Sequence, residues 1–436
     1  MPVSTPAGSP PDRGAEPIEP NAGTPAEPRA STRSVDAAWS VERYRDRVLA
    51  ACLTGGWPRV EDVPLDVADG RVSAGVVRAR VAVPRFANSA MDGFGFAYAD
   101  DATARVWTVA GEVPAGVSRT GGPGPGEVVR IMTGAPVPVS VDTVVPLEDA
   151  EVTGDGVRFT RSVRPGQHVR LAGEDVTEGD VVLVPGIRLS ARHLAAAAAV
   201  GVDTLAVAAA PRVAVLTTGD ELAASGAALG PAVIPDSNGP FLVSAVGRAG
   251  GAVGWWGHAG DEPEDVRHGL DEAVAAGADL VLVTGGVSAG DRDATRAVLA
   301  ASGAFVAVAM QPGKPQGYGV WRGVPVIALP GNPVSVAVSF ACFVRPVMDA
   351  MVGVAPPVVA RGVVAEGWRS PAGRRQFMPV SAAPDADGRL ALRPATPGGS
   401  GSHLVVSLAR ADVLAVVPED ITDVAVGTVL DLVDLL

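Results

Sequence analysis

The feature that most restricts the fold is the stretch between Leu280 and Pro315. It opens with a short unbroken apolar run, breaks at a Thr-Gly-Gly turn, and passes through a polar segment into a helical pattern. This order predicts a buried strand, a tight turn and the start of a helix. A parallel α/β sheet places ligands beyond the carboxyl ends of its strands, where helix N-termini offer unpaired N–H groups. Because the polar segment carries Asp291 and Asp293, it indicates a metal ion and not a bare anion.

The same alternation of strand and helix extends over residues 211–353. Apolar runs such as VAVLTT, VGWWGHA and VPVIAL are separated by helical patterns of ten or more residues. Strands that alternate with helices of this length form a parallel sheet with helices on both faces. We therefore predict a central, doubly wound and mostly parallel α/β domain in a multidomain α/β protein.

The flanking regions have a different texture. Residues 1–34 contain hardly any large apolar side chain and are predicted to be disordered. A helix capped by Ser40 opens the mixed region 35–210, in which short alternating runs between about residues 88 and 164 predict an inserted β-barrel, with a sandwich as the alternative. Similar short runs predict a C-terminal all-β barrel domain over residues 354–436.

Composition restricts the classes of partner and compartment. A formal net charge of -13 disfavours general binding to nucleic acid or to an anionic membrane, because most of the surface repels phosphates. Cys52 and Cys342 have neither a metal-ligand nor a thioredoxin spacing, so both are predicted to be buried small hydrophobes of a cytoplasmic protein. Polar residues interrupt the Ala-rich run 189–216 too often for a membrane span, and no signal-like segment opens the chain.

The turn after the apolar run 280–283 also allows a second interpretation, in which it carries a serine nucleophile. Gly286 to Gly290 match the G-x-S-x-G pattern, with Ser288 between a predicted strand and a predicted helix. A hydrolase of this type needs a histidine further along the chain, and His403, the only one, belongs to the predicted C-terminal β domain. A serine hydrolase is therefore the least favoured function. A phosphate-binding P-loop is absent from the sequence, because its one Gly-Lys pair is followed by Pro315.

Acidic and oxyanion-binding side chains recur where predicted strands end or predicted helices begin. They are Asp220, Glu221, Asp236, Asp291, Asp293, Lys314 and Ser335. Because parallel strands end at one edge of the sheet, these side chains can converge on one crevice. Carboxylates suit Mg²⁺, which usually bridges to substrate phosphates, while a lysine and a helix N-terminus suit an anion. The residues alone predict an enzyme that acts on a phosphate-bearing ligand with a divalent metal.

Short motifs in a fixed order resemble those of the molybdopterin molybdenumtransferase family, the MoeA proteins, which include the E domain of gephyrin. The motifs are SAMDG at 89–93, MTGAP at 132–136, GED at 173–175, TGDEL at 218–222, DSN at 236–238, TGGVSAGDRD at 284–293, PGKP at 312–315, LPGNPVS at 329–335 and GSH at 401–403. The resemblance covers roughly residues 36–434. It implies a cytoplasmic homodimer with four subdomains in each chain, one of them a MogA-like α/β domain. It also implies the reaction, in which adenylylated molybdopterin and molybdate give molybdenum cofactor and AMP with Mg²⁺.

The resemblance assigns roles to individual residues. The predicted catalytic residues are Asp92, Asp175, Asp291 and Lys314. Asp92, Thr133 and Asp175, which come from the N-terminal half, would reach the crevice of the partner subunit. The predicted metal ligands are Glu221, Asp291 and Asp293. The predicted substrate-binding residues are Thr133, Asp236, Ser335, Arg374 and Ser402, of which the last three would join Lys314 in a molybdate pocket.

One position departs from the family pattern. Many members carry a lysine where this chain has Gln311, so one cation of a pair is lost, and one charge-assisted contact is worth about 1.5–3 kcal/mol. The alternatives are a non-catalytic pterin-binding scaffold and a molybdopterin adenylyltransferase. The resemblance also suggests a separate molybdopterin adenylyltransferase and molybdenum enzymes as protein partners.

Overall fold

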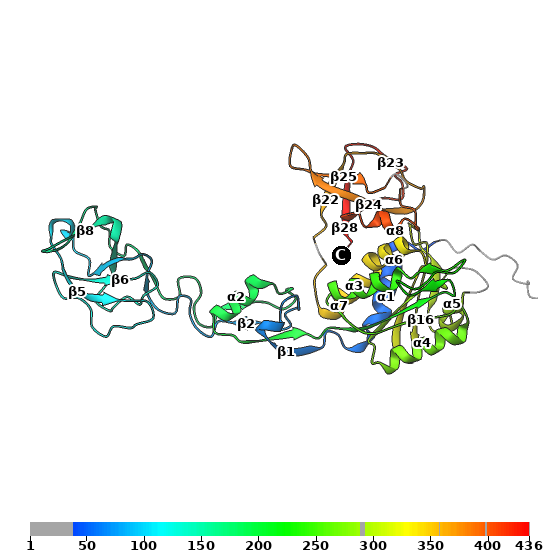
Figure 1. Ribbon diagram of the computed structural model, residues 1–436, viewed down its shortest axis with the longest axis horizontal. Helices are drawn as coiled ribbons and strands as arrows, with labels where there is room; N and C mark the ends of the chain where they lie inside the picture. The colour runs from blue at the N-terminus through cyan, green and yellow to red at the C-terminus, as the bar shows by residue number, and fades with distance from the viewer. Residues whose placement is uncertain (1–37, 288–292, 357, 397–398, 436) are drawn as a thin grey trace, which may run out of the picture. The chain divides into compact units, whose positions relative to one another are not determined.

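The computed structural model describes residues 38–287, 293–356, 358–396 and 399–435, shown in colour in Figure 1. The predicted disordered tail lies outside the described residues, and so do Ser288 and the candidate site residue Asp291.

A six-stranded sheet forms the centre of the region that follows residue 211 (Figure 1). Its strands, in spatial order, are β16 (Ala252–Ala259), β13 (Arg212–Thr218), β17 (Leu280–Thr284), β21 (Val324–Leu329), β20 (Pro315–Trp321) and β18 (Ala304–Ala307). The first four are parallel to one another, and β20 is antiparallel to both of its neighbours. The prediction of a mostly parallel sheet is confirmed.

Helices cover both faces of this sheet. One core cluster joins the sheet to α1 (Val41–Cys52), α3 (Asn238–Arg248), α6 (Pro333–Ser339) and α7 (Arg345–Val352). The other joins it to α4 (Pro263–Ala275) and α5 (Ala294–Leu299). In β17, Leu280 and Leu282 belong to the first cluster and Val281 and Val283 to the second, because successive side chains of a strand point to opposite faces. The predicted doubly wound arrangement is therefore confirmed.

The helix α1 begins where the sequence predicts. The hydroxyl of Ser40 accepts a hydrogen bond from the backbone N–H of Arg43 at 3.1 Å, as expected for an N-cap residue. Further along the helix, the fully buried Tyr44 donates its hydroxyl to the carbonyl of Gly317 in β20 at 2.8 Å. A segment from the start of the chain is thereby tied to the central sheet.

One long apolar helix of the described chain includes α6 and α7. These two helices are continuous through a π-helical turn at Phe340–Val344. The combined segment Pro333–Val352 is long and apolar enough to cross a membrane, but 83% of its most apolar stretch is buried inside the protein. Cys342 in this segment and Cys52 in α1 lie in the same core, and burial raises the pKa of each thiol to about 12. Both cysteines are buried hydrophobes, as predicted.

The N-terminal region contains two small pieces of β structure and the predicted β-rich insert. In the first part, β1 (Val60–Pro64) pairs with β12 (Thr204–Ala208), and β2 (Val77–Arg78) pairs with β11 (Val181–Leu183), next to α2 (Ala191–Ala199). The insert has a four-stranded sheet in the order β5 (Thr108–Val113), β6 (Glu127–Ile131), β4 (Gly93–Phe96) and β7 (Thr143–Pro146). Beside it are the hairpin of β8 (Ala150–Thr153) and β9 (Gly156–Phe159), and the pair of β3 (Asn88–Ser89) and β10 (Val169–Arg170). Apolar clusters pack on both faces of β4, so the insert has its own core.

The C-terminal region is a closed barrel. Five strands pair in a ring: β24 (Arg375–Pro384), β25 (Leu390–Pro394), β22 (Arg361–Val364), β28 (Val429–Asp434) and β26 (Val413–Val417), with β26 returning to β24. A short pair, β23 (Trp368–Arg369) with β27 (Asp423–Val424), and the helix α8 (Val405–Leu408) complete it. The predicted all-β barrel is confirmed. In addition, β19 (Met310–Gln311) runs parallel to β24, which brings a segment of the preceding region alongside the barrel.

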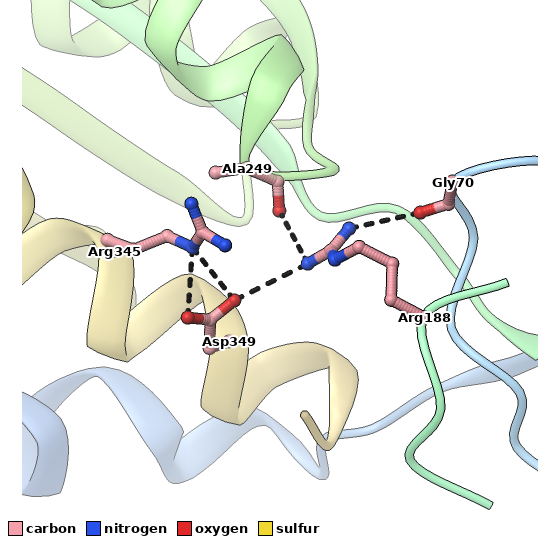
Figure 2. Close-up of polar contacts among 5 residues, drawn as sticks. All are labelled: Gly70, Arg188, Ala249, Arg345 and Asp349. Atoms are coloured by element: carbon pink, nitrogen blue, oxygen red, sulfur yellow. Dashed lines mark hydrogen bonds and ion pairs between the residues drawn. The ribbon is translucent and has the colours of Figure 1, made fainter. Parts of the chain in front are cut away.

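A buried carboxylate joins the segment before α2 to α7 (Figure 2). Asp349, whose side chain is 9% exposed, accepts hydrogen bonds from Nε of Arg345 at 3.0 and 2.9 Å and from Nη2 of Arg188 at 3.4 Å. Arg188 also donates to the carbonyl oxygens of Gly70 at 3.0 Å and Ala249 at 3.4 Å. Two guanidinium groups therefore depend on one carboxylate.

We predict that Asp349→Ala lowers the free energy of unfolding by about 3 kcal/mol, because it leaves two partly buried guanidinium groups without their counterion. Chemical denaturation followed by circular dichroism measures the change. The matched control is Asp431→Ala, since Asp431 pairs with Arg361 at an exposed site and its loss should cost at most about 1 kcal/mol. Equal stability losses in the two variants would contradict the prediction.

Candidate functional site

A cavity of about 1120 Å³ lies at the carboxyl ends of β13, β17 and β21. It is lined by the segments that follow these strands, residues 218–222, 285–287 and 330–333. A second wall includes Ile234 and Pro235 of β15 (Ile234–Pro235), which pairs with β14 (Leu222–Ala223). Three turns that are far apart in the sequence therefore meet at one edge of the sheet.

The first turns of four helices also line the cavity. Their lining residues are Ser237 and Asn238 for α3, Pro263 for α4, Asp293 and Ala294 for α5, and Pro333 and Ser335 for α6. The first N–H groups of a helix have no partner within the helix, and the helix dipole is positive at that end. The cavity therefore lies at the positive ends of four helices, which favour an anionic ligand such as a phosphate.

The charged side chains on the described part of the cavity wall are all acidic. They are Asp220, Glu221, Asp261, Glu262 and Asp293. Backbone hydrogen bonds tie two of them together, since Asp220 N donates to Asp261 Oδ2 at 3.2 Å and Asp261 N donates to Asp220 Oδ1 at 3.3 Å. Carboxylates beside helix N-termini that favour an anionic ligand suit a divalent cation carried between wall and ligand. Sequence reasoning missed Asp261 and Glu262, although both stand directly after the apolar run of β16.

The turn after β17 requires glycine. Gly285 and Gly286 have φ values of +96° and +62°, in the left-handed region that favours glycine. A Cβ on Gly285 would lie 2.5 Å from Oγ1 of Thr218, whose hydroxyl donates to the carbonyl of Thr284 at 2.9 Å. The two neighbouring strand ends thus approach each other too closely for a side chain, which keeps the floor of the cavity open.

Asp236 lies beside the cavity and does not line it. Its Oδ1 accepts hydrogen bonds from the backbone N–H groups of Asn238 at 2.9 Å and Gly239 at 3.0 Å, and so caps the start of α3. The amide of Asn238 donates to the carbonyl of Gly331 at 2.7 Å, which ties α3 to the turn after β21. Sequence reasoning selected Asp236 and left out Ser237 and Asn238, the two residues of the DSN motif that line the cavity.

The predicted molybdate-binding residues come from two regions. Ser335, which is 3% exposed, lines the cavity in the first turn of α6. Two hydrogen bonds hold Ser402 against this turn: Asn332 Nδ2 donates to its Oγ at 3.0 Å, and Val334 N donates to its carbonyl at 3.1 Å. Nη1 of Arg374 donates to Oε1 of Gln311 at 3.1 Å, across the pairing of β19 with β24. The structure therefore brings Ser402 to the first turn of α6, which contains Ser335, and joins Arg374 to Gln311, the residue that departs from the family pattern.

Lys314 lies exposed between β19 and β20, next to the cavity-lining Pro315. It is the only lysine in the whole sequence, and every other residue counted as lysine or arginine is an arginine. Arginine and lysine are not interchangeable at a site that needs a compact point charge.

The candidates from the N-terminal half are not among the residues that line this cavity. Asp92 is exposed at the edge of the insert, where its Oδ1 accepts hydrogen bonds from the backbone N–H and the hydroxyl of Thr133 at 2.6 and 2.8 Å. These two bonds hold the pKa of Asp92 below its ordinary value. Asp175 is exposed too, and its backbone N–H donates to the carbonyl of Val83 at 3.0 Å. The structure brings Asp92 and Thr133 together as a carboxylate–hydroxyl pair.

Of the predicted metal ligands, Glu221 and Asp293 line the same cavity, and Asp291 lies outside the described residues. Among the residues that the structure describes, no three His, Cys, Asp or Glu side chains are grouped closely enough to hold a metal by themselves. Mg²⁺ usually takes one or two carboxylates together with substrate phosphates and water, so two carboxylates beside a phosphate-binding edge fit this ion.

Comparison with known proteins covers nearly the whole described chain. Residues 39–201 match the model of the MoeA N-terminal region (domain I and II), residues 214–350 that of the "Probable molybdopterin binding domain", and residues 361–435 that of the MoeA C-terminal region (domain IV). Molybdopterin molybdenumtransferase 2 of Mycobacterium tuberculosis is 38% identical over 91% of this chain and 99% of its own. Molybdopterin molybdenumtransferase 1 of the same organism is 32% identical over 90% and 98%.

A solved structure agrees with these sequence relatives. The crystal structure of a molybdopterin biosynthesis MoeA protein from Pyrococcus horikoshii has a TM-score of 0.75 and 29% identity, over 92% of this chain and 99% of that one. The chain belongs to the MoeA family of molybdopterin molybdenumtransferases, which are transferases of molybdenum cofactor biosynthesis.

Proposed function

We propose that this chain inserts molybdate into adenylylated molybdopterin, with release of AMP, in the cavity at the carboxyl ends of β13, β17 and β21. The observation that carries the proposal is the convergence of four helix N-termini and an acidic wall at one edge of a parallel sheet. Both named Mycobacterium tuberculosis relatives are molybdopterin molybdenumtransferases, which supports the same reaction.

The phosphate end of the substrate would bind at the helix N-termini. The positive ends of the α3 and α6 helix dipoles would face the phosphate oxygens, and Asn238 ties the two turns together. A ligand with a diphosphate link is too negative for an acidic wall on its own. The carboxylates therefore imply a cation between wall and ligand, and we propose Mg²⁺ held by Glu221 and Asp293 with Asp291.

When bound, Mg²⁺ would neutralise charge on the phosphoanhydride that is cleaved. The chain's own part is to hold that cation and to orient the phosphates at the helix N-termini. Positioning of this kind supplies much of the rate enhancement in phosphate chemistry.

Molybdate would bind to a pocket formed by Lys314, Ser335, Ser402 and Arg374. A tetrahedral dianion is matched by cations together with hydroxyl and N–H donors. The hydrogen bonds of Ser402 to the first turn of α6 support a shared pocket for Ser335 and Ser402. Gln311 accepts from Arg374, so it orients a cation in place of supplying one.

The remaining expectations complete the proposal. We propose a cytoplasmic homodimer in which Asp92, Thr133 and Asp175 act at the crevice of the partner subunit. The division into residues 1–34, 35–210, 211–353 and 354–436 is part of the proposal, and the boundaries of the matching family regions support it.

We predict that AMP release from adenylylated molybdopterin requires both Mg²⁺ and molybdate. Asp293→Asn and Asp291→Asn should each slow AMP release about tenfold or more, because each variant loses one charge-assisted contact to the cation. AMP is measured by liquid chromatography after incubation with purified protein. Asp62→Asn, at an exposed carboxylate of β1, is the control and should release AMP like the wild type.

Tight pterin binding without AMP release under any condition would support a scaffold. Formation of the adenylylated pterin from ATP without molybdate would support an adenylyltransferase.

We predict that Lys314→Ala raises the KM for molybdate about ten- to a hundredfold, the worth of one charge-assisted contact. Lys314→Arg should not restore it, because the planar guanidinium cannot replace a compact ammonium group. The measurement is AMP release at saturating adenylylated molybdopterin and varied molybdate. Arg361→Ala, which removes an exposed cation of the barrel, serves as the control. An unchanged KM in Lys314→Ala would exclude this residue from the oxyanion site.

A further inference from the structure

A fully buried glutamine lies beneath the segment that carries Lys314. Gln316, in β20, is 0% exposed. Its Nε2 donates two hydrogen bonds, one to the carbonyl of Gly313 at 2.8 Å and one to Oγ of Ser339 at 2.6 Å. Both partners are buried with it. An amide at such a position needs a reason, because an apolar side chain would fill a core without any polar group to satisfy.

The two hydrogen bonds reach the two segments that carry Lys314 and Ser335, two of the proposed oxyanion ligands. The carbonyl of Gly313 belongs to the peptide unit that begins Lys314. Ser339 lies four residues after Ser335 in α6, so the two serines stand one above the other on the same face of the helix. One side-chain amide therefore links the backbone of Lys314 to the helix of Ser335.

The packing around Gly313 leaves this link little freedom. Gly313 has a φ of +97°, and a Cβ there would lie 3.2 Å from Nε2 of Gln316 and 3.3 Å from Oγ of Ser339. The backbone of the turn therefore rests directly on the amide and the hydroxyl. From the other side, the carbonyl of Lys314 accepts a hydrogen bond from the N–H of Val308 at 2.7 Å. The backbone on both sides of the lysine Cα is thus held.

Within the described part of the chain, Gln316 leaves one of its own buried polar atoms without a hydrogen bond, which lowers the stability of the fold. Oε1 of Gln316 is buried and has no hydrogen-bond partner among the residues that the structure describes. An unsatisfied buried carbonyl oxygen is destabilising, so the residue is not optimised for stability. At the same time, the element that it fixes presents the only lysine of the sequence.

We propose that Gln316 is a positioning residue for the oxyanion site, which sets the separation between Lys314 and Ser335 by joining the Gly313 peptide to Ser339. The proposal rests on the proposed function, because it takes Lys314 and Ser335 as ligands of molybdate. Gln316 itself does not contact the substrate. Its effect would pass through the placement of the ammonium group, where a displacement of about 1 Å can weaken a reaction about a hundredfold.

The single lysine makes a direct test possible. Full-length protein labelled with ¹³C-lysine gives one Cε signal, which reports on Lys314 alone and is titrated with sodium molybdate. We expect the signal of the wild type to shift with molybdate. In Gln316→Met, which keeps the length of the side chain and removes its donors, the Kd for molybdate should rise about tenfold. Ser339→Ala should raise it less, because the bond from Gln316 to Gly313 remains.

A matched variant separates positioning from lost stability. Val326→Ala removes apolar volume from the other face of the same sheet and should lower stability without changing the Kd for molybdate. In steady-state assays, Gln316→Met should raise the KM for molybdate and leave the binding of adenylylated molybdopterin unchanged. If Gln316→Met does not fold, Ser339→Ala carries the test.

The failure of this inference differs from failure of the proposed function. A wild-type lysine signal that molybdate does not move would overturn Lys314 as an oxyanion ligand. A responsive wild type with weakened binding in Lys314→Ala, but with wild-type affinity in Gln316→Met and Ser339→Ala, would overturn only the positioning role. An equal loss of affinity in Val326→Ala would show that general destabilisation causes the effect.

Discussion

Parallel pairing of β13, β17 and β21 is the constraint on which the rest of the structure depends. Thr217 pairs with Thr284, and Thr284 with Leu329, so the three strands end at the same level. The turns that follow must therefore share one edge, and the helices that return from them start there. Glycines at 285 and 286 allow the closest of these approaches. A cavity with N–H donors on several sides follows from this geometry before any particular ligand is considered.

The other parts of the chain are attached to this edge by a few polar contacts. The strand pairing of β19 with β24 brings Arg374 to Gln311, and Asn332 holds Ser402 against the first turn of α6. Arg375 forms ion pairs with Glu42 of α1 and with Glu419, at 3.0 Å for the second. Barrel, first helix and sheet are thus joined where the proposed oxyanion ligands lie. Lys314 and Arg374 are not among the described residues that line the acidic cavity.

Much of the fold could be predicted because local patterns and tertiary structure agree. The apolar run at 280–283 is buried on both faces of the sheet, and the strand–helix alternation after residue 211 forms the doubly wound domain. The short C-terminal runs close into a barrel. Prediction of the site was less complete. Glu221, Asp293 and Ser335 do line one cavity, but Asp261, Asn238 and Asn332 were missed, because an isolated Asp or Asn after a strand resembles any turn residue.

The sequence by itself determined the strand–helix alternation after residue 211, the parallel sheet and the family, because hydrophobic periodicity and ordered motifs can be recognised in the chain without its tertiary structure. Only the tertiary structure decided which polar groups meet. Asp236 became a helix cap because the N–H groups of Asn238 and Gly239 lie within its reach. Gln316 became a link between two site elements because β20 and α6 pack side chain against side chain. Such contacts join residues that are distant in the sequence, and no spacing rule specifies the angstrom-scale distances on which a hydrogen bond depends.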